Sequence, residues 1–425
     1  MSQITRKSLM IGWMIWLIAA VFYGLDYFQH TAPSVLIKPI SQGMGIGVEQ
    51  IAYVMSIYFP VYAISQIPAG MLLDRFGARI MLSLSSVVMS AGILLFVFDP
   101  TLDTMLIGRV LIAIGSAVAF IGCLKVAADV LPERYFPIAV GLTNTIGVTG
   151  GIFGQVLLNH LVQLHGWESA LESIAYFGLV WGVVIILFLK YKNNTPKAEK
   201  SSESKTSKFV HSLALLKNKK LWLLALYSGI MVGIVVNSFS ELYDVVFLEQ
   251  AYKVTEATAA SISVMLFIGI GFGGPSHGII ASLFGEKKVW MSICNILTLF
   301  IFSSIVLLNH IIPVDLLYVM FFMLGFFVSS MLLAFSVVEE MFPKEIKGTS
   351  LAIVNMVIGL CGALFQYLIS WISVKLNGGQ SIHVGINGDV FDKAFVFLIV
   401  PLIISTVIIV SMAVLGHREN KKIIL

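Results

Sequence analysis

The stretch from Gly70 to Arg79 reads GMLLDRFGAR, and a later stretch from Gly278 to Lys287 reads GIIASLFGEK. The two stretches share glycines at their first and eighth positions, and each pair of glycines is 208 residues apart. Glycine permits backbone conformations that other residues adopt only at a cost. The match predicts the same tight turn at two places in the chain.

A second pair of segments repeats at nearly the same offset. LPERYFPIAVGLTNTIGVTGGIFGQ ends at Gln155, and FPKEIKGTSLAIVNMVIGLCGALFQ ends at Gln366. Four identical residue pairs lie 211 residues apart: Pro132 with Pro343, Asn144 with Asn355, Gly151 with Gly362, and Gln155 with Gln366. Because both offsets are close to half of the 425 residues, they indicate a duplicated unit.

The composition excludes most soluble proteins. Of all residues, 58% are hydrophobic and 12% are charged, and the mean hydropathy is +0.94. An ordinary soluble domain has about 25% charged residues. A cytosolic enzyme, a secreted disulfide scaffold and a disordered chain are therefore excluded. A single-pass receptor is also excluded, because the apolar residues extend over nearly the whole length.

Apolar runs that are long enough to cross a bilayer recur along the chain, and one crossing takes about 20 residues of helix. They cover residues 9–33, 50–73, 79–98, 104–130, 136–163, 169–190, 221–248, 257–283, 288–309, 314–340, 347–374 and 391–416. The runs are continuous rather than alternating, which favours helices over a β-barrel. With the repeat, they predict an all-α polytopic membrane protein of 12 transmembrane helices in two pseudo-symmetric six-helix bundles. The expected bundles are residues 1–190 and 221–425, joined by a lysine-rich cytoplasmic linker at 191–220.

The distribution of positive charge predicts the orientation. With the N-terminus in the cytoplasm, 21 of the 27 Lys and Arg residues fall on the cytoplasmic side and 4 on the outer side. Cytoplasmic loops of membrane proteins carry such an excess. Both termini are therefore expected in the cytoplasm. The protein is expected to lie in a bacterial inner or plasma membrane and to be a monomer. The net charge of +4 reflects membrane orientation, and no nucleic-acid partner is expected.

No motif indicates an enzyme, a cofactor or a metal. The chain has no P-loop, no GxGxxG–Asp arrangement, no GxSxG elbow and no HExxH pair, so ATP-driven pumping by this chain is not expected. Its cysteines, Cys123, Cys294 and Cys361, lie in apolar runs without CxxC or His-rich spacing. Neither a disulfide framework nor a zinc site is expected.

GMLLDRFGAR closely resembles the signature G-x-L-x-D-R-x-G-R-R of the major facilitator superfamily. GRVLIAIG, from Gly108 to Gly115, resembles the fourth-helix motif of that family, with Ala113 where glycine is common. The resemblance covers the whole chain, with its twelve spans, two halves and central cytoplasmic loop. It implies the fold of that family and a secondary transporter. Such a transporter works by alternating access, with the two halves rocking around a site near the membrane midplane.

The resemblance also implies a conformational latch, formed by Gly70, Asp74, Arg75, Gly77 and Arg79. In the family, the aspartate lies near the N-terminal end of the eleventh helix, which here is near Lys347 and Gly348. A carboxylate is favoured there by the helix dipole. The second copy has Ser282 and Leu283 in place of the charges, so the latch should be asymmetric. The alternative is a solvated loop whose charges serve only membrane orientation.

Asp26 lies well inside the first span, where an ionised carboxylate is costly. Tyr23, Tyr27 and His30 flank it and form one polar face of a helix. Such a face is expected to look into the bundle interior or a watery cavity. The alternative is that Asp26 lies near the outer membrane boundary and is simply hydrated.

Arg109 lies in the fourth span at a depth similar to that of Asp26 and His30. An arginine at that depth needs a carboxylate, backbone carbonyls or water. One hypothesis is an Asp26–Arg109 pair. The other is an Arg109 that binds a substrate anion while Asp26 or His30 handles a proton. A purely structural ion pair is the alternative to both.

Lys125 follows Arg109 by 16 residues and points about 160° away from it on a straight helix. Asp129, four residues later, is a natural partner. Lys125 either reaches to the cytoplasm with Asp129 as its counter-ion or faces the cavity.

Further polar residues recur in the fifth, seventh and eleventh spans. Asn144 is matched by Asn355, whose helix also carries Gln366, and Asn237 and Glu241 are spaced i, i+4 with Glu241 toward the outer mouth. Amides in hydrocarbon need partners. These residues are therefore either contacts between helices or contacts to the substrate.

The sequence thus predicts a proton-coupled or facilitative transporter of a small polar solute. Arg109, Lys125, the tyrosines and the amides favour an anionic or zwitterionic metabolite. Carboxylates, amino acids or peptides, sugar acids and carboxylate-type metal chelates all remain open. A drug–proton antiporter is the alternative, although no Pro joins the glycines of the fifth span as in the family's antiporter motif. A third possibility, a non-transporting membrane sensor, predicts ligand binding without flux.

Overall fold

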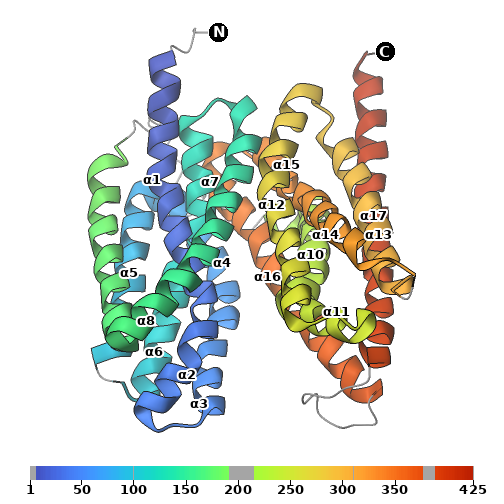
Figure 1. Ribbon diagram of the computed structural model, residues 1–425. Helices are drawn as coiled ribbons and strands as arrows, with labels where there is room; N and C mark the ends of the chain where they lie inside the picture. The colour runs from blue at the N-terminus through green and yellow to red at the C-terminus, as the bar shows by residue number, and fades with distance from the viewer. Residues whose placement is uncertain (1–5, 99, 191–214, 310, 377–387, 425) are drawn as a thin grey trace. The chain divides into compact units, whose positions relative to one another are not determined.

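The computed structural model describes all residues except 1–5, 99, 191–214, 310, 377–387 and 425. Most of the predicted linker at 191–220 therefore lies outside the described residues. Within the described residues every regular element is helical (Figure 1). The elements are α1 (Arg6–Thr31), α2 (Pro33–Met44), α3 (Val48–Ser56), α4 (Tyr58–Phe76), α5 (Ala78–Phe98), α6 (Leu102–Ser116), α7 (Ala119–Val130), η1 (Glu133–Tyr135), α8 (Phe136–Phe188), η2 (Leu215–Lys217), α10 (Lys219–Val232), η3 (Gly233–Tyr243), α11 (Asp244–Tyr252), α12 (Glu256–Phe284), α13 (Lys287–Leu307), α14 (Val314–Val328), η4 (Ser329–Leu332), α15 (Leu333–Met341), η5 (Lys344–Ile346), α16 (Lys347–Leu376) and α17 (Gly388–Ile424).

Eleven helical stretches of the described residues are long and apolar enough to cross a membrane. One of them, Glu133–Phe188, has 56 residues and is broken at Gly166, where φ is +81° and ψ is +164°. Because one span takes about 20 residues, the two legs of α8 on either side of Gly166 account for the fifth and sixth predicted spans. The prediction of an all-α polytopic membrane protein is confirmed.

Several apolar runs are interrupted inside the protein. The fourth span breaks between α6 and α7, and the seventh changes from α10 to the π-helical η3 and then to α11. A short helix, α2, follows the first span. Hydropathy reports how apolar a run is and not the spacing of its backbone hydrogen bonds, so these breaks leave no mark in the apolar pattern. Non-α turns inside helices often lie at functional sites.

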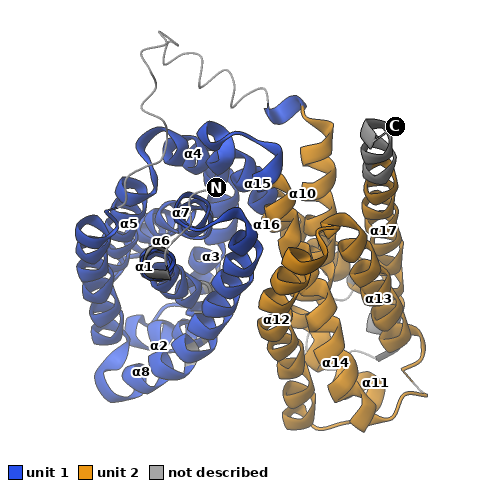
Figure 2. Cartoon of the chain, turned by 90° about the horizontal axis from the view of Figure 1, so that it is seen from above, with its two compact units in different colours: residues 1–217, 339–356 blue, residues 218–338, 357–425 orange. Residues whose placement is uncertain are grey.

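The chain forms two compact units, which Figure 2 shows in different colours. Unit 1 contains residues 1–217 and 339–356, and unit 2 contains residues 218–338 and 357–425. The segment 339–356 is thus part of unit 1, although its sequence position is in the second half. The predicted domain boundaries at 190 and 221 stay a prediction.

Equivalent helices pack in the same way within each unit. In unit 1, α5 packs against α6 and the second leg of α8, where Ser86 Oγ donates a 2.7 Å hydrogen bond to the Gly178 carbonyl. In unit 2, α13 packs against α14 and α17, where Asn295 Nδ2 donates to Ser405 Oγ at 2.9 Å. Polar side chains thus join apolar helices at matching places. The two bundles are pseudo-symmetric, as the duplication predicts.

Candidate functional site

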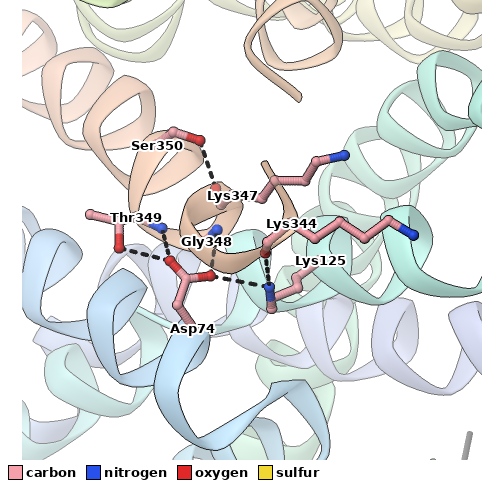
Figure 3. Close-up of polar contacts among 7 residues, drawn as sticks. All are labelled: Asp74, Lys125, Lys344, Lys347, Gly348, Thr349 and Ser350. Carbon is pink, nitrogen blue, oxygen red and sulfur yellow. Dashed lines mark hydrogen bonds and ion pairs between the residues drawn. The ribbon is translucent and has the colours of Figure 1, made fainter. Parts of the chain in front are cut away.

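The Asp74 carboxylate, near the C-terminal end of α4, is surrounded by hydrogen-bond donors (Figure 3). Its Oδ1 accepts from the Gly348 backbone N–H at 2.8 Å and from Lys125 Nζ at 3.1 Å. Its Oδ2 accepts from both the N–H and the hydroxyl of Thr349, each at 2.8 Å. The carboxylate therefore sits at the N-terminal end of α16, where the helix dipole favours negative charge. This is the place that the family resemblance implies for it.

Glycines allow this close approach. A Cβ on Gly70, one turn before Asp74, would lie 2.7 Å from the Ala352 Cβ and 2.8 Å from the Gly348 carbonyl oxygen. A Cβ on Gly348 would lie 2.7 Å from Asp74 Oδ1. Gly77 then ends α4 with φ +81° and ψ +159°, a conformation that is essentially restricted to glycine.

Lys125 joins this cluster from α7. Its ammonium group pairs with Asp74 and also donates to the Lys344 carbonyl in η5 at 3.2 Å. The side chain is buried. The sequence named Asp129 as the natural partner, and the structure adds Asp74, a carboxylate 51 residues away along the chain. Nearby, a buried ion pair joins Lys347 to Glu339 and ties α16 to α15.

The two arginines of the predicted latch lie elsewhere. Arg79 Nε donates to the Ile186 carbonyl at 2.8 Å and fastens α5 to the second leg of α8. Arg75 is exposed, and its guanidinium lies 5.1 Å from the ring centroid of Phe76. Among the predicted latch residues, Asp74 therefore makes the contact with α16, and Gly70 and Gly77 shape the backbone around it.

The predicted polar face of α1 is packed inside unit 1. Asp26 has an exposed fraction of 0% and lies beside Ser116, the last residue of α6. Tyr23 is buried against Phe120 at a ring-centroid distance of 5.1 Å, and it also contacts Tyr27 at 5.9 Å. The side chain of His30 lies outside the described residues. The structure thus places three of the four predicted residues together in the interior of unit 1.

Arg109 is 3% exposed and lies in α6. Its Nε donates to the Met55 carbonyl at 3.4 Å, and its guanidinium lies 4.6 Å from the ring centroid of Tyr58. Tyr58 stacks on Tyr62 with ring centroids 5.7 Å apart. A backbone carbonyl and an aromatic face are both favourable for a guanidinium.

Within the described part of the chain, Arg109 forms no ion pair with a carboxylate. The position of Asp26 gives the physical reason. Asp26 lies beside Ser116, and seven residues separate Ser116 from Arg109, a rise of about 10 Å along a helix. Among the described residues the Asp26–Arg109 pair is therefore absent, and the binding of a substrate anion by Arg109 stays a prediction.

The predicted polar residues of the eleventh span, Asn355 and Gln366, are half-buried. Asn355 Nδ2 donates to the Tyr62 hydroxyl at 2.9 Å, inside unit 1. Asn144 lies on α8 and is half-buried in the same unit.

In unit 2, three predicted residues form one chain of hydrogen bonds. Gln366 Nε2 donates to the Asn237 carbonyl at 2.9 Å, and Asn237 Nδ2 donates to Glu241 Oε2 at 3.3 Å. Glu241 itself is exposed. These contacts connect η3 with α16.

Sequence reasoning missed the aromatic residues of α4. Tyr58 and Tyr62 form the partners of Arg109 and Asn355, yet they were not among the candidates. A signal for them existed, because they precede Gly70 and Asp74 on the same helix at multiples of four residues, and residues four apart are neighbours on a helix. No group of three or more metal-ligating side chains occurs in the residues that the structure covers.

The chain is similar to known proteins over most of its length. A family model described as Major Facilitator Superfamily matches residues 15–249 and 242–423. FucP of E. coli, a transporter of that family solved in the outward conformation, is similar with a TM-score of 0.65 and 14% identity. The match covers 92% of this chain and 98% of FucP, and at this identity it supports the fold alone.

Two of the relatives with similar sequences differ in identity and coverage. Probable anion transporter 5 of Arabidopsis thaliana is 27% identical over 41% of this chain and 40% of its own length. The chain therefore spans less than two thirds of that relative. Probable galactarate/D-glucarate transporter GudP of Bacillus subtilis (strain 168) is 21% identical over 93% of both chains.

Proposed function

The chain belongs to the major facilitator superfamily, and we propose that it carries small hydroxylated organic anions across the membrane together with protons. Family membership makes it a multi-pass membrane transporter of a small molecule and not an enzyme. The solute class and the coupling ion are the proposal.

The observation that carries the proposal is the environment of Arg109. A guanidinium that is almost fully buried holds only a carbonyl and an aromatic face as partners among the described residues. A buried arginine is stabilised by an anion, and a carboxylate matches its two parallel N–H groups. A solute carboxylate would supply that partner.

Hydroxyl groups on the solute have matching partners on α4, one turn after Tyr58, whose ring lies against Arg109. The Tyr62 hydroxyl and the Asn355 amide are already joined in unit 1 and offer both donors and acceptors. Galactarate, a compound named for the Bacillus subtilis relative, combines carboxylates with hydroxyl groups. The name of the plant relative also refers to an anion.

Asp26 is proposed as the proton carrier. It is fully buried in a transmembrane helix, where a carboxyl group is favoured in its neutral form and functional use is common. The same face of α1 offers Tyr23 and Tyr27 as further candidates for contacts to the proton. Contacts to the solute or the proton are also proposed for His30, Asn144 and Lys125. In unit 2, Asn237, Glu241 and Gln366 form the corresponding hydrogen-bonded group.

The test of the solute class is uptake of radiolabelled galactarate into proteoliposomes. Wild-type protein should accumulate the acid, and Arg109→Gln should lower uptake at least about tenfold, because a charged hydrogen bond contributes about 1.5–3 kcal/mol. Arg134→Gln is the matched control, since Arg134 is exposed and contacts Tyr135. Full uptake by Arg109→Gln would contradict the proposed role of Arg109.

The proton role is tested with Asp26→Asn. This variant should retain exchange of labelled for unlabelled solute but lose accumulation driven by a pH gradient. Gradient-driven accumulation at the wild-type level would rule out Asp26 as the carrier and leave facilitated transport.

The remaining expectations complete the proposal. We place the protein in a bacterial inner or plasma membrane as a monomer, with both termini in the cytoplasm. Residues 1–190 and 221–425 would be the two bundles, and the Asp74 cluster would act as the cytoplasmic latch. Cysteine labelling of Lys7→Cys and Lys253→Cys with an impermeant reagent on whole cells tests the orientation, since only the second should react.

A further inference from the structure

A stripe of residues that winds around α4 connects the Arg109 environment with the Asp74 cluster. Its residues follow each other at spacings of four, so each step turns by about 40° and the stripe winds by about 160° from its first residue to its last. In order they are Tyr58, Tyr62, Gln66, Gly70 and Asp74. We call this set of residues the α4 stripe. Four of its members already have defined contacts, and Gln66 is the exception.

The first turns of α16 run along the same stripe. Asn355 contacts Tyr62, and the backbone of Gly348 contacts both Gly70 and Asp74. Gln66 lies between Tyr62 and Gly70 on the stripe. Its side chain therefore faces the same part of unit 1 as the Tyr62–Asn355 pair, one turn closer to the Asp74 cluster.

Gln66 has an exposed fraction of 0%, and neither its amide oxygen nor its amide nitrogen has a hydrogen-bond partner in the described structure. The Tyr62 hydroxyl is near enough to interact with the Gln66 amide electrostatically, but no hydrogen bond of good geometry joins the two groups. A buried amide without partners is destabilising, because it has lost its hydrogen bonds to water and gained none. Such a group in the middle of an apolar helix is expected to gain its partner from a ligand.

The chemistry of the amide indicates which part of a solute it binds. An amide donates and accepts, and so does a hydroxyl group, whereas a carboxylate only accepts. Gln66 lies eight residues from Tyr58, a rise of about 12 Å, which is roughly the length of an extended six-carbon acid with a hydrogen bond at each end.

We propose that Gln66 is a specificity-determining residue that hydrogen-bonds a hydroxyl group of the acid whose carboxylate binds Arg109. This inference rests on the proposed function and narrows its solute class to hydroxylated acids. Gln66 would distinguish them from acids of the same length without hydroxyl groups.

The experiment measures the affinity of purified protein for galactarate and for adipate, the same six-carbon diacid without hydroxyl groups. Wild type should prefer galactarate. Gln66→Met, which keeps the shape and removes the amide, should weaken galactarate binding about tenfold or more and leave adipate binding within about twofold. Gln66→Leu is the second variant, in case Met does not fold well.

Thermal unfolding without solute separates this role from a structural one. Gln66→Met should be at least as stable as wild type, because the Gln66 amide has no hydrogen-bond partner among the described residues. Asn295→Leu is the matched control, since its amide donates to Ser405: it should lower the unfolding temperature and leave the galactarate-to-adipate ratio unchanged.

The possible failures are distinct. An unchanged ratio in Gln66→Met, as expected if the amide holds only a water molecule, overturns the inference while acid binding itself persists. A lower unfolding temperature with equal loss for both acids also overturns it, in favour of a structural amide. Wild type that binds neither acid overturns both this inference and the proposed solute class, and Arg109→Gln would then also have no effect.

Discussion

At the end of α4, the Asp74 carboxylate receives four hydrogen bonds, from Gly348, Thr349 and Lys125. Its repeat counterpart near the end of α12, Ser282, is exposed and donates to the Ile279 carbonyl of its own helix at 2.7 Å. Both copies end their helix with a glycine of positive φ. The duplication has therefore kept a glycine of positive φ at the end of the helix in both halves and the hydrogen-bonding chemistry in only one.

The starts of α16 and α8, which are equivalent in the repeat, have diverged as well. Gly348 and Thr349 supply two N–H groups and a hydroxyl at the start of α16. The residues 211 positions earlier, at the start of α8, are Pro137 and Ile138. Proline has no N–H, and isoleucine has no hydroxyl. Asp74 of the first half thus meets a full set of donors at the start of α16, whereas the equivalent helix start has lost one N–H and the hydroxyl.

The largest expected effect comes from Asp74→Asn. The change removes the charge that four donors share, and each hydrogen bond to a charged group contributes about 1.5–3 kcal/mol. If the cluster is a latch, the transport rate should fall at least about tenfold while the equilibrium affinity for solute changes less than about twofold. Initial uptake rates in proteoliposomes and binding to purified protein measure the two quantities.

Ser282→Ala in the second copy is the control for this change. It removes a hydroxyl that contacts only its own helix and should leave both quantities at wild-type levels. Turnover of Asp74→Asn equal to that of wild type would show that the cluster has no role in the transport cycle.

The second-largest loss of transport is expected for Lys125→Met. Without the ammonium group, Asp74 keeps the three donors of α16, so the loss of transport should be smaller than for Asp74→Asn, about threefold to fivefold. Asp74→Asn leaves Lys125 as a buried cation, which is more costly than removing both charges. The double variant should therefore transport better than Asp74→Asn alone. A double variant that is worse than either single variant would contradict the pairing.

Lys125 also illustrates what sequence reasoning could not find. A helical wheel compares residues on one straight helix, and for Lys125 it indicated Asp129. The partner observed, Asp74, lies on another helix, and the break between α6 and α7 removes the straight helix on which the angle to Arg109 was based. Such a pair depends on packing, which hydropathy and spacing do not encode.

Other features of the molecule could be predicted from the sequence. The spans followed from apolar length, and the position of Asp74 at the start of α16 followed from a family signature rather than from physics. Gln66 was missed because one amide in an apolar run resembles a helix contact. Only its lack of a partner in the structure sets it apart.

A smaller effect is expected for substitutions of Gly77 and Gly285, the glycines at the two turns of the repeat. Gly77 has φ +81° and ψ +159°, whereas Gly285 has φ +72° and ψ −23°. The first conformation is nearly restricted to glycine, and the second is closer to the left-handed helical region that asparagine adopts. Gly77→Ala should therefore destabilise the protein by about 1–3 kcal/mol and Gly285→Asn by less than about 1 kcal/mol.

Thermal unfolding of the purified variants in the same detergent compares the two glycines. Gly77→Asn serves as the matched variant at the first turn, and it should remain less stable than Gly285→Asn. Equal losses at the two positions would mean that the backbone difference between the turns has no energetic consequence.

The smallest expected effect is that of Ser282→Asp, which restores a carboxylate to the second copy. In the first copy the carboxylate is useful only because Gly348, Thr349 and Lys125 surround it. The helix start equivalent to that of α16 offers fewer donors, since Pro137 has no N–H, and residue 282 is exposed. Stability should change by less than about 0.5 kcal/mol, and uptake should stay within the error of wild type. A clear gain or loss of transport in Ser282→Asp would mean that the second turn meets donors during the cycle, and the latch would then be symmetric in use although it is asymmetric in sequence.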